Sequence, residues 1–107
     1  MPSKQNEFYK RLVFKGKYNE FKDFYDENKE MIYKSIIEVF QGFKNTRKKS
    51  LSLYISAKIK GLEWDTEFNF KKDECIILKR DLMPYFEQTE DYETCSEIIS
   101  LHKDLTN

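Results

Sequence analysis

Residues 50–70 read SLSLYISAKIKGLEWDTEFNF, and apolar and polar side chains alternate through almost all of this stretch. Such alternation is typical of a β-strand with one buried face, because successive side chains of a strand point to opposite sides. A two-residue turn at Lys60-Gly61 sets Lys58 opposite Glu63, and every cross-strand pair is then apolar with apolar or polar with polar, except Ile55 with Thr66. A shift of one residue would destroy that match. The sequence therefore predicts an antiparallel β-hairpin.

Residues 19–44 carry the pattern of a long amphipathic helix. Apolar residues recur every three or four positions between Phe21 and Phe43, as expected for one buried helical face. The apolar stripe becomes polar at Asn28, so the segment is interpreted as one helix or as two helices joined there. Gly42 lies near the expected end, and a loop is predicted to begin at residue 45.

Two segments allow either helix or strand. Residues 4–14 fit a helical face, although Leu12-Val13-Phe14 before Gly16 also suits an edge strand, and we favour the helix. A lone hairpin is marginal in water and needs a third strand or a helix on its apolar face. Residues 74–79 are predicted to supply a third antiparallel strand, with a helix capped by Asp73 as the competing interpretation.

The C-terminal third is predicted to form acidic helices. Asp81 is the expected N-cap of the first, with Pro84 tolerated in its opening turn. Thr89 is the expected N-cap of the last, and acidic residues follow it where negative charge favours the helix dipole. The expected buried stripe of the last helix is Tyr92, Cys95, Ile98, Ile99, His102 and Leu105.

These elements predict an α+β fold. A long N-terminal amphipathic helix (or two), a hairpin or three-stranded meander, and C-terminal helices packed on the sheet would form one globular domain over residues 1–107. The polar residues 1–6 are expected to be flexible. Cys75 and Cys95 stand in no CxxC arrangement, and no apolar run is long enough to span a membrane, so a reduced cytoplasmic protein is expected. Whether the two thiols are ever bridged stays open.

Charge divides unevenly along the chain. Residues 1–60 hold 14 Lys or Arg and 7 Asp or Glu, a net charge of +7, whereas residues 61–107 hold 5 and 12, a net charge of −7. Between Arg80 and Lys103 there is no Lys or Arg. Such a division governs the field that the surface presents to partners rather than the fold, and it indicates a charged docking surface.

No constellation of residues predicts catalysis. His102 is the single histidine, and Cys95 lies two helical turns away, about 10 Å by helix rise. Cys75, Cys95 and His102 match no paired-ligand zinc spacing, and the carboxylates lie in no EF-hand loop. Three glycines in all exclude a glycine-rich phosphate loop. The sequence therefore predicts a binding protein without cofactor or metal, not an enzyme.

A basic loop and the strand that follows it form one candidate site. Basic groups interleaved with an exposed aromatic ring and small hydroxyls are typical of surfaces that bind single-stranded RNA or DNA. On the opposite strand, Glu63, Asp65 and Glu67 share the sheet face and would weaken the attraction to phosphate, and cross-strand ion pairs are the simpler interpretation of that face. The candidate nucleic-acid-binding residues are Lys44, Arg47, Lys48, Lys49, Tyr54, Lys58 and Lys60.

The acidic C-terminal stretch is the other candidate site, and its function is the first prediction. Its carboxylates would occupy a basic groove on another protein, such as the phosphate channel of a nucleic-acid enzyme. A composition rich in Lys, Asn, Ile and Phe suggests an AT-rich coding sequence and a phage or bacterial source. We therefore predict a phage-type inhibitor of a host nucleic-acid-handling enzyme, such as an anti-restriction or anti-CRISPR factor acting in the host cytoplasm. Self-association of opposite halves is a further alternative. The candidate protein-binding residues are Asp81, Glu87, Glu90, Asp91, Glu93 and Glu97.

Overall fold

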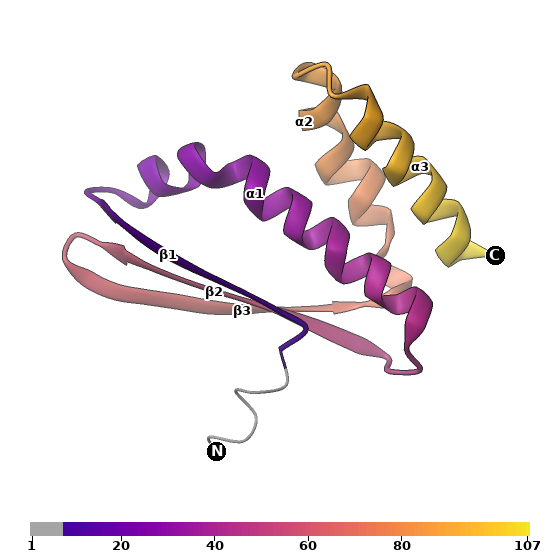
Figure 1. Cartoon of the computed structure of the whole chain (residues 1–107), viewed down its shortest axis with the longest axis horizontal. Helices are drawn as coiled ribbons and strands as arrows, with labels where there is room; N and C mark the ends of the chain where they lie inside the picture. The colour runs from indigo at the N-terminus through magenta and orange to yellow at the C-terminus, as the bar shows by residue number, and fades with distance from the viewer. Residues whose placement is uncertain (1–7) are drawn as a thin grey trace.

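The computed structural model describes residues 8–107 and confirms the α+β class (Figure 1). The expectation for residues 1–6 lies outside the described residues. The chain forms a three-stranded mixed sheet with helices before and after the hairpin. In chain order the elements are β1 (Lys10–Tyr18), α1 (Phe21–Gly42), the 3-10 turn η2 (Phe43–Asn45), β2 (Ser50–Ile59), β3 (Leu62–Lys71), the 3-10 turn η3 (Lys72–Glu74), the π-helical turn η4 (Leu78–Leu82), α2 (Met83–Gln88) and α3 (Tyr92–Thr106).

The hairpin is confirmed in its predicted register. Lys58 pairs with Glu63 next to the turn, and Ser50 pairs with Lys71 at the far end. Lys60 and Gly61 have φ angles of 58° and 76°, so both turn residues adopt the left-handed conformation that matches the twist of a two-residue hairpin. This unbroken ladder brings the start of β2 beside the end of β3.

The helix expected over residues 4–14 is wrong within the described residues, because β1 is a strand. Leu12 faces the helices and Arg11 faces the other side, which is strand alternation rather than a helical stripe. β1 runs parallel to β2, and its register shifts between Val13 and Lys17. Parallel pairing needs a crossover connection, and α1 provides it.

The segment 19–44 forms one continuous helix, so the two-helix alternative is wrong. Asn28, the proposed joint, lies within the second turn of α1. Its side-chain amide donates to the Phe24 carbonyl at 2.9 Å and to the Tyr18 hydroxyl at 3.1 Å. The polar residue in the stripe therefore ties the helix to β1 instead of interrupting it.

The predicted third antiparallel strand over residues 74–79 is also wrong, because this segment is helical. The competing helical interpretation is closer. Asp81 is not an N-cap, since it lies inside η4 and pairs with Arg80, while Pro84 does occupy the first turn of α2. Residues 75–78 are all apolar and do not alternate with polar residues as in a half-buried strand. Cys75 and Leu78, three positions apart, are both buried in the core, which is the spacing of a helical turn.

α3 begins two residues later than predicted. Asp91, not Thr89, is its N-cap, and the Asp91 carboxylate accepts from the Thr94 backbone N–H at 3.2 Å. The Thr89 hydroxyl donates to the Tyr85 carbonyl instead. Cys95, Ile98 and Leu105 are buried as expected, whereas Tyr92 and Ile99 are exposed, His102 is half-buried and the unpredicted Thr94 and Leu101 are buried.

The elements are layered around α1 (Figure 1). α1 lies over β1 and β2, and α2 and α3 pack against α1 and the short turns. Phe40 of α1 joins the layers, with ring centroids 5.4 Å from Phe70 and 5.8 Å from Phe43. No helix of residues 8–107 covers the opposite side of the sheet, which we call the open face. Within the same residues, no helix combines the length and apolar character needed to cross a membrane.

Candidate nucleic-acid interface

Five basic residues from two distant segments surround one pocket. The hairpin register places Lys71 beside Ser50, so the end of β3 meets the loop that precedes β2. The cavity between them measures about 670 Å³ and is also bordered by Asp73 and Leu105. We call it the basic pocket, and its cations are Arg47, Lys48, Lys49, Lys71 and Lys72.

The cations of the basic pocket have no ion-pair partner among residues 8–107. Two residues of the predicted basic site differ in this respect. Lys44 pairs with Asp104 at 3.3 Å and points toward α3, and Lys60 pairs with Glu20 at 3.5 Å at the hairpin turn. The structure thus brings Arg47, Lys48 and Lys49 together and separates Lys44 and Lys60 from them.

Local hydrogen bonds shape both sides of the pocket. The backbone N–H of Lys48 donates to the Thr46 hydroxyl at 3.2 Å, which turns the loop before β2. The backbone N–H of Lys71 donates to the Glu74 carboxylate at 2.8 Å, which closes the turn after β3. Glu74 is therefore engaged with the backbone, and Asp73 is the one acidic residue that lines the cavity.

An aromatic group lies on the open face, on the same strand that leaves the basic pocket. Tyr54 of β2 stacks on Phe8, with ring centroids 5.0 Å apart and an interplanar angle of 23°. The Arg11 guanidinium lies 5.1 Å from the Tyr54 ring centroid and 5.9 Å from that of Phe8. From Ser50 at the pocket to Tyr54 is four strand residues, about 13 Å at a rise of ~3.3 Å per residue. Basic and aromatic groups therefore follow one another along β2.

Acidic residues line the opposite side of the open face. The Tyr54 hydroxyl donates to the Asp65 carboxylate at 2.8 Å, and this hydrogen bond raises the pKa of Tyr54. Glu63 and Glu67 flank Asp65 on the same side of β3. Lys58 also lies on this face opposite Glu63, yet no ion pair joins β2 to β3 among the described residues. The open face is thus basic along β1, aromatic in the middle and acidic along β3.

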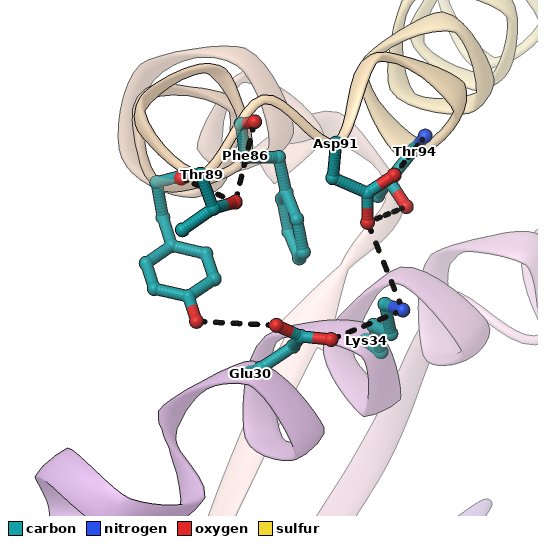
Figure 2. Close-up of polar contacts among 7 residues, drawn as sticks. Glu30, Lys34, Phe86, Thr89, Asp91 and Thr94 are labelled. Atoms are coloured by element: carbon teal, nitrogen blue, oxygen red, sulfur yellow. Dashed lines mark hydrogen bonds and ion pairs between the residues drawn. The ribbon is translucent and has the colours of Figure 1, made fainter.

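Two of the six predicted acidic residues have partners within the fold. Asp81 pairs with Arg80 at 2.8 Å. Figure 2 shows Asp91 between Thr94 and Lys34: its carboxylate accepts from the Thr94 hydroxyl at 2.7 Å and lies 3.8 Å from the Lys34 ammonium. The hydrogen bonds from Thr94 lower the pKa of Asp91.

The remaining four acidic residues are exposed and divide into two places. Glu87 lies in the last turn of α2, and Glu90 lies in the connection between α2 and α3. Glu93 and Glu97 lie one turn apart on α3 and border a groove of about 560 Å³ between α3 and the end of α1. Asp104, which pairs with Lys44, closes that groove. The predicted acidic site is thus a partly neutralised helix surface with one groove.

Sequence reasoning missed four residues of this region. Lys71 follows directly from the predicted hairpin register, because it is the partner of Ser50, and Lys72 is its neighbour. Arg11 and Phe8 reach Tyr54 through the parallel pairing of β1 with β2. No short-range signal in the sequence indicates that pairing, since its two strands are separated by the whole of α1.

The two thiols are separate from this region. Cys75 and Cys95 are both free and buried. Burial raises the pKa of Cys95, and the nearby Glu87 and Asp91 carboxylates act in the same direction. Both cysteines therefore behave as core residues.

Comparison of the chain with protein-family models, with curated proteins and with solved structures finds no match.

Proposed function

We propose that this protein binds single-stranded nucleic acid. The basic pocket holds the phosphate backbone, and the open face beside Tyr54 receives the bases. The observation that supports this most is the convergence of five cations from two distant segments on one cavity, without an ion-pair partner among residues 8–107. Uncompensated cations attract phosphate and release its condensed counterions when they bind it.

The acidic edge of the open face favours a single strand over a duplex. Glu63, Asp65 and Glu67 line β3, whereas Arg11 and Tyr54 lie along β1 and β2. A single backbone fits the basic side and leaves its bases free to stack on aromatic rings. A second backbone would lie against the carboxylates of β3 and be repelled. This asymmetry also explains how a protein with zero net charge binds a polyanion.

Fluorescence anisotropy with labelled single-stranded RNA, single-stranded DNA and duplex 12-mers tests the proposal. If all five cations neutralise phosphate, the log–log slope of affinity against salt should be about −3.5 for a single strand. The double variant Lys48→Glu/Lys72→Glu should bind about 100-fold more weakly and reduce the slope to about −2.

The matched control is Lys29→Glu/Lys79→Glu, which makes the same change of charge on α1 and η4. Neither Lys29 nor Lys79 lines the basic pocket or the open face. The control should keep most of the affinity. Equal losses in the two double variants would mean that only the total charge matters, and absence of binding at low salt would reject the proposal.

Binding of a basic protein surface is the second candidate function. This function is supported by the groove that Glu93 and Glu97 border, because a basic side chain of a partner could enter it and meet their carboxylates. In its most specific form the partner is a host nucleic-acid enzyme that the protein inhibits by occupying the phosphate channel. The carboxylates of Asp81 and Asp91 contribute less to such a surface, because each has a partner within the fold.

A tagged pull-down from host lysate, with and without nuclease treatment, distinguishes the two functions. A stoichiometric protein that survives nuclease and is lost with Glu93→Lys/Glu97→Lys supports the acidic groove. Protein bands that vanish with nuclease support the basic pocket. Glu93 and Glu97 are the better residues to reverse, because substitution of Asp91 also removes the cap of α3.

A further inference from the structure

Both outer strands of the sheet have an unpaired edge in the described part of the chain. The strand order β1-β2-β3 leaves one side of β1 and one side of β3 without a neighbour. β3 pairs with β2 in continuous register over ten residues, without a bulge and without a proline. A long regular edge of this kind is a template for another strand.

The two faces of β3 specify what kind of strand fits. On the helix side, Phe68 is 43% exposed and Leu62 is 70% exposed, because α1 covers β1 and β2 but leaves this edge open. On the open face β3 carries Glu63, Asp65 and Glu67. The fitting strand is therefore apolar on the helix side and basic on the open face.

β1 has that pattern at Leu12 and Arg11 but not at their neighbours, because Lys10 lies on the helix side, where it pairs with Glu38, and the exposed Val13 lies on the open face. Leu12 lies on the helix side, opposite the buried Ile55, and Arg11 lies on the open face beside Tyr54. Lys17 pairs with Lys58 and therefore shares the open face. The edge of β1 in one copy therefore complements the edge of β3 in another through the charge of Arg11 on the open face and the apolar side chain of Leu12 on the helix side.

A groove beside β1 of one copy could receive the exposed Phe68 of a second copy. It measures about 540 Å³, lies between β1 and α1, and has Leu12 and Met31 among its lining residues. Met31 is 53% exposed, so its side chain is accessible to a residue that enters the groove. The ion pair between Lys10 and Glu38, at 3.1 Å, forms part of the rim.

We propose that the protein self-associates head to tail, with β3 of one copy added to β1 of the next and Phe68 seated in the groove beside Met31. Pairing of β3 with β3 would set Glu63, Asp65 and Glu67 against their own copies, and like charges opposite one another destabilise a sheet. The contact joins two different surfaces, so it produces open or closed chains rather than a simple dimer. This inference is independent of the nucleic-acid function.

The register shift in β1 limits the strength of the contact. Between Val13 and Lys17 the β1 strand is irregular, so a regular ladder is available mainly over Lys10–Val13. Lysines and irregularities on an edge strand are features that weaken edge-to-edge pairing. The association is therefore weak, with dissociation constants of about 0.1–1 mM, and screening of the charged pairs by salt weakens it further.

Sedimentation velocity of nuclease-treated protein, from low micromolar to millimolar concentration, tests the proposal. The mass should rise above the 13.0 kDa of one chain with concentration, and this rise should be smaller at high salt. Phe68→Lys blocks the β3 edge and Met31→Lys blocks the groove, and each variant alone should stay monomeric. Ile99→Lys, which alters an apolar side chain of similar 52% exposure on α3, should associate like the unmodified protein.

A mixture of the two blocked variants distinguishes head-to-tail pairing from every symmetric arrangement. Each variant keeps the edge that the other has lost, so the mixture should form a heterodimer of twice the chain mass and no larger species. A monomeric unmodified protein at every concentration and salt would overturn the proposal. Association of Met31→Lys alone would also overturn it, because β3 would then be pairing with itself. Circular dichroism of each variant separates loss of association from loss of fold.

Discussion

The basic pocket and the acidic C-terminal segment contain similar numbers of like charges, but the fold treats them differently. The cations of the pocket come from two segments more than twenty residues apart and have no ion-pair partner among residues 8–107. In the acidic segment, Asp91 caps α3 and Asp81 pairs with its neighbour Arg80. Two of the six acidic residues are therefore engaged within the fold, whereas all five cations of the basic pocket remain available to a ligand.

Removal of one buried ring near the basic pocket and one in the acidic half should have the largest effect. Phe40 contacts Phe43, just before the basic loop, and Phe70, next to Lys71, while Phe86 packs near Tyr33 and Tyr85 in the acidic half. Phe40→Ala and Phe86→Ala should each cost about 3–5 kcal/mol in the free energy of unfolding, measured by urea titration. Only Phe40→Ala should weaken oligonucleotide binding under conditions where both variants are folded.

The milder pair Phe40→Leu and Phe86→Leu keeps this test usable if either alanine variant unfolds. Both changes remove part of a fully buried ring, so they should lower stability less than alanine does. Equal binding by the two leucine variants would show that the position of the basic pocket does not depend on Phe40.

Charge reversal should change the stability of the fold to different extents in the two regions. Lys48→Glu/Lys72→Glu should change the free energy of unfolding by less than about 0.5 kcal/mol, because neither lysine is paired within the described residues. Glu93→Lys/Glu97→Lys should cost about 1 kcal/mol, since Glu93 lies in the first turn of α3, where negative charge favours the helix dipole, and Glu97 lies near Lys34. Thermal unfolding at low salt measures both. A larger loss in the lysine variant would mean that the pocket contributes to folding.

The hairpin was predictable because its information is local. The alternation on both sides of Lys60-Gly61 fixes every cross-strand pair, and it implies that Lys71 joins the basic loop. The length of α1 was predictable from its apolar stripe, apart from Asn28, whose contacts to Tyr18 required the tertiary fold. The N-cap of α3 was misplaced by two residues, because Thr89 and Asp91 are both suitable caps.

The place of the third strand in the sheet was not predictable from local patterns, although Leu12-Val13-Phe14 before Gly16 did suit an edge strand. β1 gains its place by parallel pairing across the length of α1, and nothing near Lys10–Tyr18 signals its partner. The segment 74–79 was assigned to that role because the hairpin needed a third strand. With β1 in place, residues 74–79 are free to turn and to bury Cys75 and Leu78 under the C-terminal helices. Arg11 and Phe8 were absent from the candidate site for the same reason.

The contribution of Asp91 to the stability of the fold should depend on pH. Hydrogen bonds from Thr94 lower the pKa of this carboxyl, so its stabilising effect is present above about pH 4, the ordinary range of an unfolded Asp, and is lost as the pH falls through the lower folded pKa. Asparagine is also a good N-cap but carries no charge. Asp91→Asn should therefore lower Tm by a few degrees at pH 7 and by less near pH 2. If the difference in Tm between Asp91→Asn and the unmodified protein were the same at pH 7 and near pH 2, the effect would come from packing and not from charge.

The smallest expected effects on stability come from two residues with a positive φ angle, one in the basic half of the chain and one in the acidic half. Lys60, in the hairpin turn, and Glu90, between α2 and α3, have φ angles of 58° and 59°, a left-handed conformation that costs most residues free energy. Asparagine tolerates this conformation better, so Lys60→Asn and Glu90→Asn should each stabilise the fold by about 0.5 kcal/mol. Both gains should be smaller at low salt, because Lys60→Asn removes the ion pair with Glu20 and Glu90→Asn removes a negative charge that favours the dipole of α3. Screening should bring both gains to about 0.5 kcal/mol at about 0.5 M salt. Urea titrations at both salt concentrations measure the difference. A loss of stability at Glu90 that persists in high salt would mean that its side chain has a role in the turn beyond its charge.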